Sequence, residues 1–431
     1  MTFPPTNIRY LLAGAVSVFA FALPASASAL EYVPGEVVVR YEPGQAPEGV
    51  PSGEPVVLKA DNVREAVADL REQPGVEYAV PNVIAHAAAA RSTQSQFFPN
   101  DPDLLSLQWN FVGANGVRAP EAWANAIAAG APGGAGVTVA VLDTGIAYSD
   151  RSPYKRSPDF TSGQFVKGYD YVDNDSYPND TNGHGTHVAG TVAEATNNGK
   201  YVAGLAYGAK LMPVRVLDSN GEGSSSDIAK GIRFAVKKKV RLINLSLEFD
   251  SRVKASDIPQ ILDALDYARS KGALIVGATG NEGADTVSYP ARSSSVMAVG
   301  STTEDGCLSD FSNGGSGIDI VAPGGGLDAN VAGDSRCRQA FNGKGIYQVT
   351  FLGRSVTRFG LPGTYEGTSM ATPHVTATAA LVMAMGLLGT TKPSPATLQR
   401  HLESTARDLG RSGSDSLYGW GLLDAAKATT K

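Results

Sequence analysis

Three residues of this chain have types and surroundings suited to nucleophilic catalysis. Asp143 lies in the segment VLDTG, His184 in NGHGTHVAG and Ser369 in GTSMATPH. A serine hydroxyl is a weak nucleophile at neutral pH, so it needs an adjacent base, and the base needs a buried acid that holds its tautomer. Small neighbours around all three residues leave room for a substrate backbone. The chain order Asp, His, Ser is one of the known permutations of such a triad.

The three motifs together resemble those of the subtilisin-like serine proteases, the subtilases, across roughly residues 105–427. The resemblance implies that Ser369 is the nucleophile, His184 the general base and Asp143 the acid that orients the base. It implies a secreted bacterial serine endopeptidase, a monomer that cleaves proteins and peptides and is autoprocessed from a precursor. The alternatives are a catalytically inactive surface binding module with the same fold, an esterase and a sedolisin-like peptidase. His184 argues against the last, because sedolisins use a carboxylate as the base.

Two further histidines lie close to these motifs. We expect His187 and His374 to be packed structural side chains. A metal-binding pair of His184 and His187 is the alternative, but no other His, Cys or carboxylate stands at a zinc-ligand spacing. Taken alone, Ser369 would be an ordinary helix N-cap. In this context it is predicted to open a helix whose N–H groups favour developing negative charge.

The resemblance also implies which residues bind the substrate. Asn281 is expected to donate its side-chain amide to the oxyanion, together with the backbone N–H of Ser369; the alternative is an asparagine that only shapes a turn. Ser288 is expected at the base of the primary specificity pocket. Two extended segments are expected to pair with the peptide as added β-strands. Their residues are Ser246, Leu247, Ala278, Thr279 and Gly280.

One residue of these segments departs from the family pattern. Glu248 stands where the family usually has glycine, and with Glu282 it puts two carboxylates at the pocket rim, which favours a basic substrate residue. However, residues 76–88 resemble a propeptide tail that binds the cleft as a product, with Ala88 in the primary pocket. Because rim charges are screened by solvent, we expect cleavage after Ala88 and a preference for Ala, Leu, Phe or Met over Lys.

Calcium is the expected cofactor, at one or two structural sites. Three carboxylates within residues 170–175 repel one another unless a cation is present. The loop resembles the calcium loop of thermitase-like subtilases; a solvated acidic loop is the alternative. The ligands that this resemblance implies are Asp170, Asp173, Asp175, Tyr177 and Asn179. A second site is implied by Gln108, Asp159 and Asn198, although the nearby loop 196–202 differs in length from that of the family.

Apolar strands alternate with helical patterns from residue 105 to the C-terminus. Such alternation predicts an α/β fold, a three-layer, doubly wound and mostly parallel sheet. Asp143 follows a strand directly, at the sheet edge where such folds form their sites. The expected strands are residues 137–142, 211–217, 242–247, 274–277, 296–299 and 318–321. The expected helices are residues 226–237, residues 368–385 and a helix that begins at His184.

The N-terminal part of the chain has a different character. Residues 1–29 combine Arg9, an apolar run and small-residue cleavage sites, which predicts a signal peptide; a membrane anchor is the alternative. Residues 30–88 show a small α+β pattern, with strands expected at residues 35–41 and 75–80 and a helix at residues 63–72 whose apolar face is Val63, Val67 and Leu70. The pattern resembles the ferredoxin-like subtilase propeptide, a folding assistant and inhibitor. A permanent N-terminal domain is the alternative. Residues 89–104 are a linker and N-terminal extension before the catalytic domain of residues 105–431.

The composition indicates a folded protein with a large core. The 431 residues are 42% hydrophobic and 18% charged, with a net charge of −6, which excludes a polycationic nucleic-acid-binding protein. We expect the mature protein to be extracellular or periplasmic, without a membrane span. In an oxidising compartment Cys307 and Cys337 either form a disulfide or remain two buried thiols too far apart to bridge.

Overall fold

The computed structural model describes residues 32–51, 53–83, 95–338 and 343–431. The chain divides into two compact units, residues 1–93 and 94–431. The expected signal peptide, the cleavage point after Ala88 and the first part of the linker, residues 89–94, lie outside the described residues. Within the described ranges, every helix is too short or too polar to cross a bilayer.

The first unit is a three-stranded antiparallel sheet covered by one helix. β1 (Tyr32–Tyr41) lies between β2 (Val56–Lys59) and β3 (Val76–Val83), and α1 (Val63–Arg71) packs on the sheet. β2 was not expected, because four residues after a Pro- and Gly-rich loop carry too little strand pattern. The expected apolar face of the helix is buried, as its 3.6-residue spacing predicts. It consists of Val63, Val67 and Leu70.

The second unit is built on a seven-stranded sheet whose order is β10-β9-β8-β7-β4-β6-β5. Every neighbouring pair is parallel, so the expected α/β class is confirmed. The short edge strand β5 was not expected. The strands are β4 (Thr138–Asp143), β5 (Tyr169–Asp170), β6 (Lys210–Arg215), β7 (Leu242–Leu245), β8 (Leu274–Ala278), β9 (Val296–Thr302) and β10 (Ile320–Pro323). A separate antiparallel pair is formed by β11 (Thr350–Phe351) and β12 (Phe359–Gly360).

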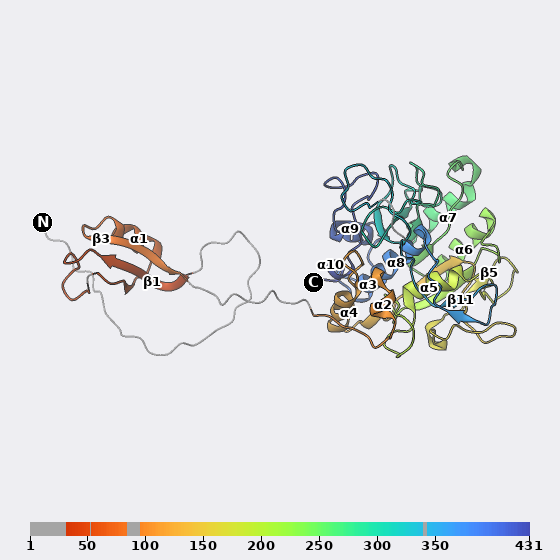
Figure 1. Cartoon of the computed structure of the whole chain (residues 1–431), viewed down its shortest axis with the longest axis horizontal. Coiled ribbons are helices and arrows are strands. Elements are labelled where there is room, and N and C mark those ends of the chain that lie inside the picture. The colour runs from red at the N-terminus through yellow and green to blue at the C-terminus, as the bar shows by residue number, and fades with distance from the viewer. Residues whose placement is uncertain (1–31, 52, 84–94, 339–342) are drawn as a thin grey trace. The chain divides into compact units, whose positions relative to one another are not determined.

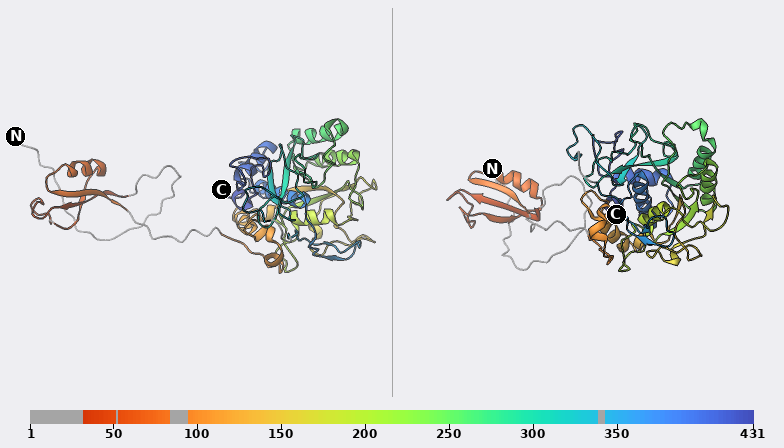
Figure 2. Two further views of the ribbon diagram at one scale, coloured as in Figure 1. Left: turned by 45° about the horizontal axis from the view of Figure 1, so that its top comes forward. Right: turned by 45° about the vertical axis from the view of Figure 1, so that its right-hand side comes forward.

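Helices cover both faces of this sheet (Figure 1). α8 and α5 lie on one face, whereas α6 and α7 pack together on the other (Figure 2). The α-helices are α2 (Leu104–Leu107), α3 (Trp109–Val112), α4 (Ala119–Ala128), α5 (His184–Ala193), α6 (Ser225–Lys237), α7 (Pro259–Ser270), α8 (Thr368–Ala384), α9 (Pro395–Thr405) and α10 (Ala425–Ala428). Three short 3₁₀ turns are η1 (Pro132–Gly134), η2 (Ser162–Gln164) and η3 (Ala255–Asp257).

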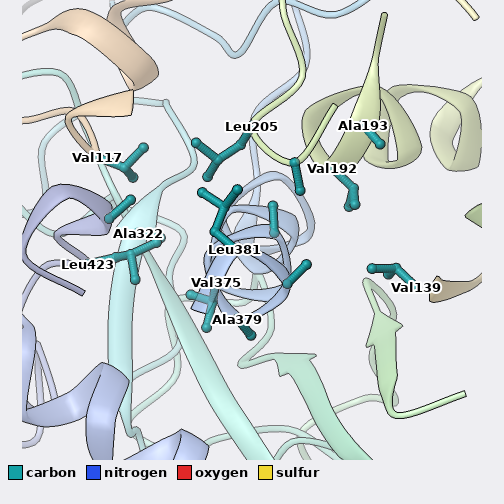
Figure 3. Packing of buried hydrophobic residues seen from close by; sticks show 14 of the residues in the cluster. Val117, Val139, Val192, Ala193, Leu205, Ala322, Val375, Ala379, Leu381 and Leu423 are labelled. Carbon is teal, nitrogen blue, oxygen red and sulfur yellow. The ribbon is translucent and has the colours of Figure 1, made fainter. Parts of the chain in front are cut away.

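Alternation along the strands divides the interior into two cores. In β4, Val139 and Val141 face the core that contains α5 and α8, whereas Ala140 and Leu142 face the core that contains α6 and α7. Successive strand residues point to opposite faces, so a strand buried on both sides is apolar throughout. Figure 3 shows side chains of α8, among them Leu381, packed against those of surrounding segments.

The central helix α8 is buried at every position from Thr368 to Met383. It contacts β4, β7, β8, β9 and β10. The residues of α8 are mostly small, with Ala and Thr the most frequent, so the strands and α5 pack close to it. Ser369, the second residue of this helix, is therefore held in a helix that is buried along nearly its whole length.

The two cysteines are joined. A disulfide links Cys307 and Cys337, with a Cα–Cα distance of 5.0 Å and a sequence separation of 30 residues. Of the two alternatives that the sequence left open, the structure shows the bridge.

We predict that removing the bridge in a Cys307→Ser/Cys337→Ser variant lowers the free energy of unfolding by roughly 3–4 kcal/mol, because the unfolded chain gains loop entropy. Thermal melting of the full chain checks this. A reducing agent should lower the midpoint of the wild type and leave that of the double variant unchanged. Equal midpoints for oxidised wild type and variant would show that the bridge contributes nothing.

Candidate active site

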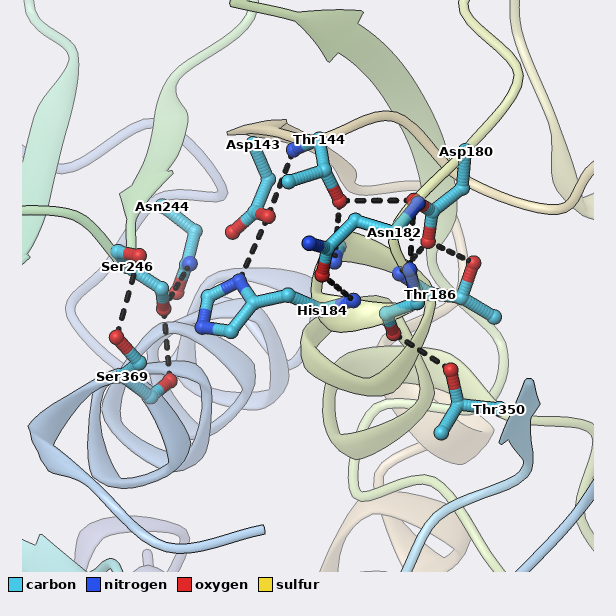
Figure 4. A network of polar contacts seen from close by, with 12 residues as sticks. Asp143, Thr144, Asp180, Asn182, His184, Thr186, Asn244, Ser246, Thr350 and Ser369 are labelled. Carbon is cyan, nitrogen blue, oxygen red and sulfur yellow. Dashed lines mark hydrogen bonds and ion pairs between the residues drawn. The ribbon is translucent and has the colours of Figure 1, made fainter. Parts of the chain in front are cut away.

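Asp143 and His184 meet at the carboxyl edge of the sheet. Asp143 is the last residue of β4, and His184 is the first residue of α5. His184 Nδ1 lies 2.7 Å from Asp143 Oδ1, which also accepts the N–H of Thr144 at 2.7 Å. The Asp143 side chain is fully buried, whereas that of His184 is 25% exposed. In Figure 4 the imidazole lies between Asp143 and Ser369, with its second nitrogen turned away from the aspartate.

The electrostatic surroundings of His184 favour its protonated form. Burial lowers the pKa of the imidazole, but the charge and hydrogen bond of Asp143, helped by the charge of Asp180, outweigh burial and raise the pKa above its ordinary value. A histidine of this kind accepts a proton readily and holds it as a stabilised imidazolium.

Ser369 is anchored to the segment that follows β7. Its Oγ donates to the carbonyl of Ser246 at 3.2 Å, and Ser246 Oγ donates to the carbonyl of Ser369 at 2.8 Å. Asn244 Nδ2 donates to Ser246 Oγ at 2.9 Å, and Asn244 Oδ1 accepts from Thr376 Oγ1 at 2.8 Å. This chain of bonds fixes the start of α8 against the strand end (Figure 4).

A buried aspartate that we did not single out from the sequence holds the histidine turn in place. Asp180 accepts the N–H groups of Asn182, Gly183 and Thr186 and the hydroxyls of Thr144 and Thr186. It therefore connects the residue after Asp143 with the N-terminus of α5, where negative charge is favourable. An acid shortly before a helix start was the available signal, but it resembles any N-terminal cap.

Asn281 has its amide held from both sides. Its Oδ1 accepts the N–H of Thr368 at 2.8 Å and the hydroxyl of Thr368 at 3.0 Å. Its Nδ2 donates to Glu248 Oε1 at 3.1 Å. A primary amide has two N–H donors, so one remains for a ligand beside the N-terminus of α8.

The expected substrate segments come together next to the triad. Ser246 and Leu247 follow β7, and Thr279 and Gly280 follow β8, its neighbour in the sheet. Ser288 is fully buried and bonds through its N–H to the carbonyl of Thr279 at 2.8 Å. A cleft of about 510 Å³ runs past the site. Its lining includes His184, Ser369, Ser246, Leu247 and Glu248.

The two other histidines are structural, as expected. His187 is fully buried, bonds through Nε2 to the carbonyl of Ile346 and stacks on Tyr365, and burial lowers its pKa to about 3. His374 bonds to Asn110, and burial lowers its pKa to about 4. Both are therefore neutral at physiological pH.

Two carboxylates of the acidic loop, residues 170–175, are paired with an arginine of the neighbouring strand β6. Arg215, at the end of β6, lies opposite Asp170 of β5 in the sheet register. Its Nη1 donates to Asp170 Oδ2 at 2.8 Å and to Asp173 Oδ2 at 2.5 Å. Asp175 Oδ1 accepts the N–H of Tyr177 at 2.7 Å, and Asn179 Oδ1 accepts the hydroxyl of Ser149 at 2.8 Å. The repulsion from which the sequence argument inferred calcium is relieved here by a guanidinium.

The second expected calcium group has a different character. Asp159 Oδ1 accepts from Asn198 Nδ2 at 2.7 Å, but the buried Asp159 Oδ2 has no partner among the described residues. Burial raises the pKa of Asp159 to about 7. The Gln108 amide exchanges two hydrogen bonds with the backbone of Ala203. In the described part of the chain, no three His, Cys, Asp or Glu side chains gather into a metal-binding cluster.

Known proteins resemble this chain along most of its length. A model of the subtilase family, peptidase S8, matches residues 134–421. The chain is 34% identical to the thermophilic serine proteinase of Bacillus sp. strain AK1, over 93% of this chain and 88% of the relative. It is 35% identical to thermitase of Thermoactinomyces vulgaris, over 77% and 99% of the two chains. It is 40% identical to Subtilisin Savinase of Lederbergia lenta, over 69% and 91%.

Solved structures agree with these matches. A protease from Pseudoalteromonas arctica PAMC 21717 superposes with a TM-score of 0.62 at 33% identity, over 77% of this chain and 98% of that one. A cold-adapted subtilisin-like serine proteinase superposes with a TM-score of 0.52 at 31% identity, over 68% and 89%. With its Asp, His and Ser motifs brought together on a parallel sheet, the chain belongs to the subtilase family and is a subtilisin-like serine endopeptidase.

Proposed function

We propose that this endopeptidase works through an acyl-enzyme formed on Ser369. The observation that carries the proposal is the 2.7 Å contact between the buried Asp143 and His184, with the imidazole facing the N-terminus of α8. His184 takes the proton of Ser369 Oγ as the hydroxyl attacks the substrate carbonyl, and later returns it to the leaving amine. Asp143 holds the imidazole in one tautomer and stabilises its charged form. A water molecule then hydrolyses the ester by the same proton transfers.

The negative charge that develops on the substrate oxygen needs donors. The free N–H of the Asn281 amide and the backbone N–H of Ser369 supply them, and the dipole of α8 adds to their effect. Because Thr368 and Glu248 hold the amide from both sides, the donor needs little reorientation when charge appears. The segments after β7 and β8 bind the extended peptide by backbone hydrogen bonds.

The first unit is proposed to be a removable inhibitor and folding assistant of a monomeric, secreted precursor. Its support is that it forms a compact unit with a core of its own. A 60-residue domain has a small core, which suits a segment that is later degraded.

Calcium is proposed at the Asp159 group rather than in the acidic loop. Gln108, Asp159 and Asn198 would hold the ion, and the support is the unpartnered, buried Oδ2 of Asp159, a hard anionic oxygen of the kind that calcium prefers. In the acidic loop, Arg215 already neutralises Asp170 and Asp173. A bound ion would stabilise the native state.

Replacing Ser369 with Ala should abolish labelling by a fluorophosphonate and leave a folded, unprocessed precursor, because both events need the nucleophile. Mass spectrometry of protein purified from a protease-deficient host measures both. Wild type treated in parallel is the control. If the wild type itself takes up no label, the chain is the inactive binding module instead.

The acid limb of the kcat/KM profile should have its midpoint above pH 6.5, because the base is active only when neutral and its pKa is raised. Asp143→Asn should move this midpoint to lower pH, since the charge that raises the pKa is gone, and should cut the rate by roughly 10³–10⁴. Hydrolysis of an activated ester between pH 4 and 10 measures both effects. A midpoint that does not move would remove Asp143 from the proposed triad.

Calcium should raise the melting midpoint of the inactive Ser369→Ala chain relative to chelator, with about 2–3 kcal/mol of stabilisation at saturating ion. Asp159→Asn should eliminate the difference, whereas Asp173→Asn/Asp175→Asn should retain it. Circular dichroism follows the melting without interference from autolysis. Loss of the difference in the double variant alone would place calcium in the acidic loop, and equal midpoints with calcium and chelator in the parent Ser369→Ala chain would exclude both sites.

A further inference from the structure

The carboxylate of Glu248 lies between the two segments that flank the reacting bond. Glu248 Oε2 accepts the N–H of Asn281 at 2.9 Å, and Oε1 accepts from Asn281 Nδ2 at 3.1 Å. A Cβ placed on Gly280 would collide with Glu248 Oε2 and would lie 3.0 Å from Ser288 Oγ. The carboxylate therefore lies against the backbone of Gly280, between the segment after β7 and the segment after β8. We call the space between these two segments the crevice.

This crevice is where the substrate side chain next to the scissile bond must go. Ser369 Oγ is bonded to Ser246 at the start of one segment, and the proposed oxyanion donor Asn281 ends the other. A carbonyl that is attacked by Ser369 and stabilised by Asn281 lies between them. The side chain on the adjacent α-carbon then enters the space between the segments, beside Glu248.

The charge of Glu248 has no cationic partner. No ion pair of Glu248 occurs among the described residues, whereas the nearby Asp250 pairs with Arg252 at 2.5 Å. The cleft that borders the segment after β7, but not the segment after β8, includes Glu222, Glu248 and Asp250 in its lining and no Lys or Arg. Burial raises the pKa of Glu248, against the effect of its bonds from Asn281. The site is thus short of positive charge.

We propose that Glu248 makes this enzyme selective for Lys or Arg at the residue before the scissile bond. This inference rests on the proposed function and names its substrate class. A side chain that fills the crevice expels water from around the carboxylate. An apolar side chain leaves a buried, unpaired charge, which is costly, whereas an ammonium or guanidinium pairs with it. The free-energy cost of leaving the carboxylate unpaired therefore lowers kcat/KM for an apolar substrate relative to a basic one.

We expected an apolar residue on the assumption that Glu248 and Glu282 are both screened rim charges. Glu282 is exposed, in accord with that assumption. Glu248 is half-buried and accepts two hydrogen bonds from Asn281, so solvent screens it less than Glu282. The proposed preference therefore differs from the one that we expected from the Ala88 register.

The test uses mature enzyme and peptides that are identical except for Lys, Arg, Leu or Ala before the scissile bond, at pH 8. The wild-type kcat/KM should be at least about tenfold higher for Lys and Arg than for Leu. Glu248→Gln keeps the size and one of the two acceptor oxygens for Asn281 but removes the charge, so this ratio should fall at least about tenfold. Glu282→Gln is the matched control, and its ratio should stay within about twofold of wild type.

A wild-type enzyme that prefers Leu or Ala, or a Glu248→Gln variant with an unchanged ratio, would overturn the inference. The ratio does not depend on the amount of active enzyme, so a general loss of rate through Asn281 does not affect it. Fluorophosphonate titration of the same samples separates the two proposals. Labelled enzyme without basic preference contradicts only the role of Glu248, whereas unlabelled and inactive wild type contradicts the triad as well.

Discussion

The active site depends on one constraint, the common direction of the strands in the central sheet. Because β4, β7 and β8 are parallel neighbours, the residues that follow them leave the sheet at the same edge, and α5 and α8 begin there. Asp143, His184, Ser369 and Asn281 are brought together by this geometry. If one strand ran the other way, its residue would lie at the opposite edge, about 15 Å away for a five-residue strand.

The pKa of each histidine at or near this site depends on the groups directly around it. Three histidines of the unit show the range. His187 and His374 are buried with neutral partners, so their pKa values fall to about 3 and about 4. His184 is next to Asp143 and near Asp180, and its pKa rises. The difference comes from the neighbouring charges, because desolvation acts in the same direction on all three.

Buried carboxylates show the same dependence on their partners. Asp180 is satisfied by hydroxyl and N–H groups and acts as a clamp between β4 and α5. Asp170 is neutralised by Arg215. Asp159 and Glu248 form no ion pair among the described residues, and for these two we infer an external cation, calcium for the first and a basic substrate residue for the second. An acid-rich stretch of sequence does not distinguish these cases, because the cation comes from elsewhere in the chain or from outside it.

The sequence by itself determined the α/β class, six of the seven strands of the sheet, the apolar face of α1 and the types of the residues at the site, because these follow from local periodicity and from short motifs. It did not determine the partners. Arg215 lies opposite Asp170 through strand register, and Asp180 accepts the hydroxyl of Thr144. Cys307 is joined to Cys337, and Glu248 accepts hydrogen bonds from Asn281 across the crevice. Each of these contacts joins segments that are distant in sequence, and only the packing of the folded chain decides which distant groups lie within hydrogen-bonding distance.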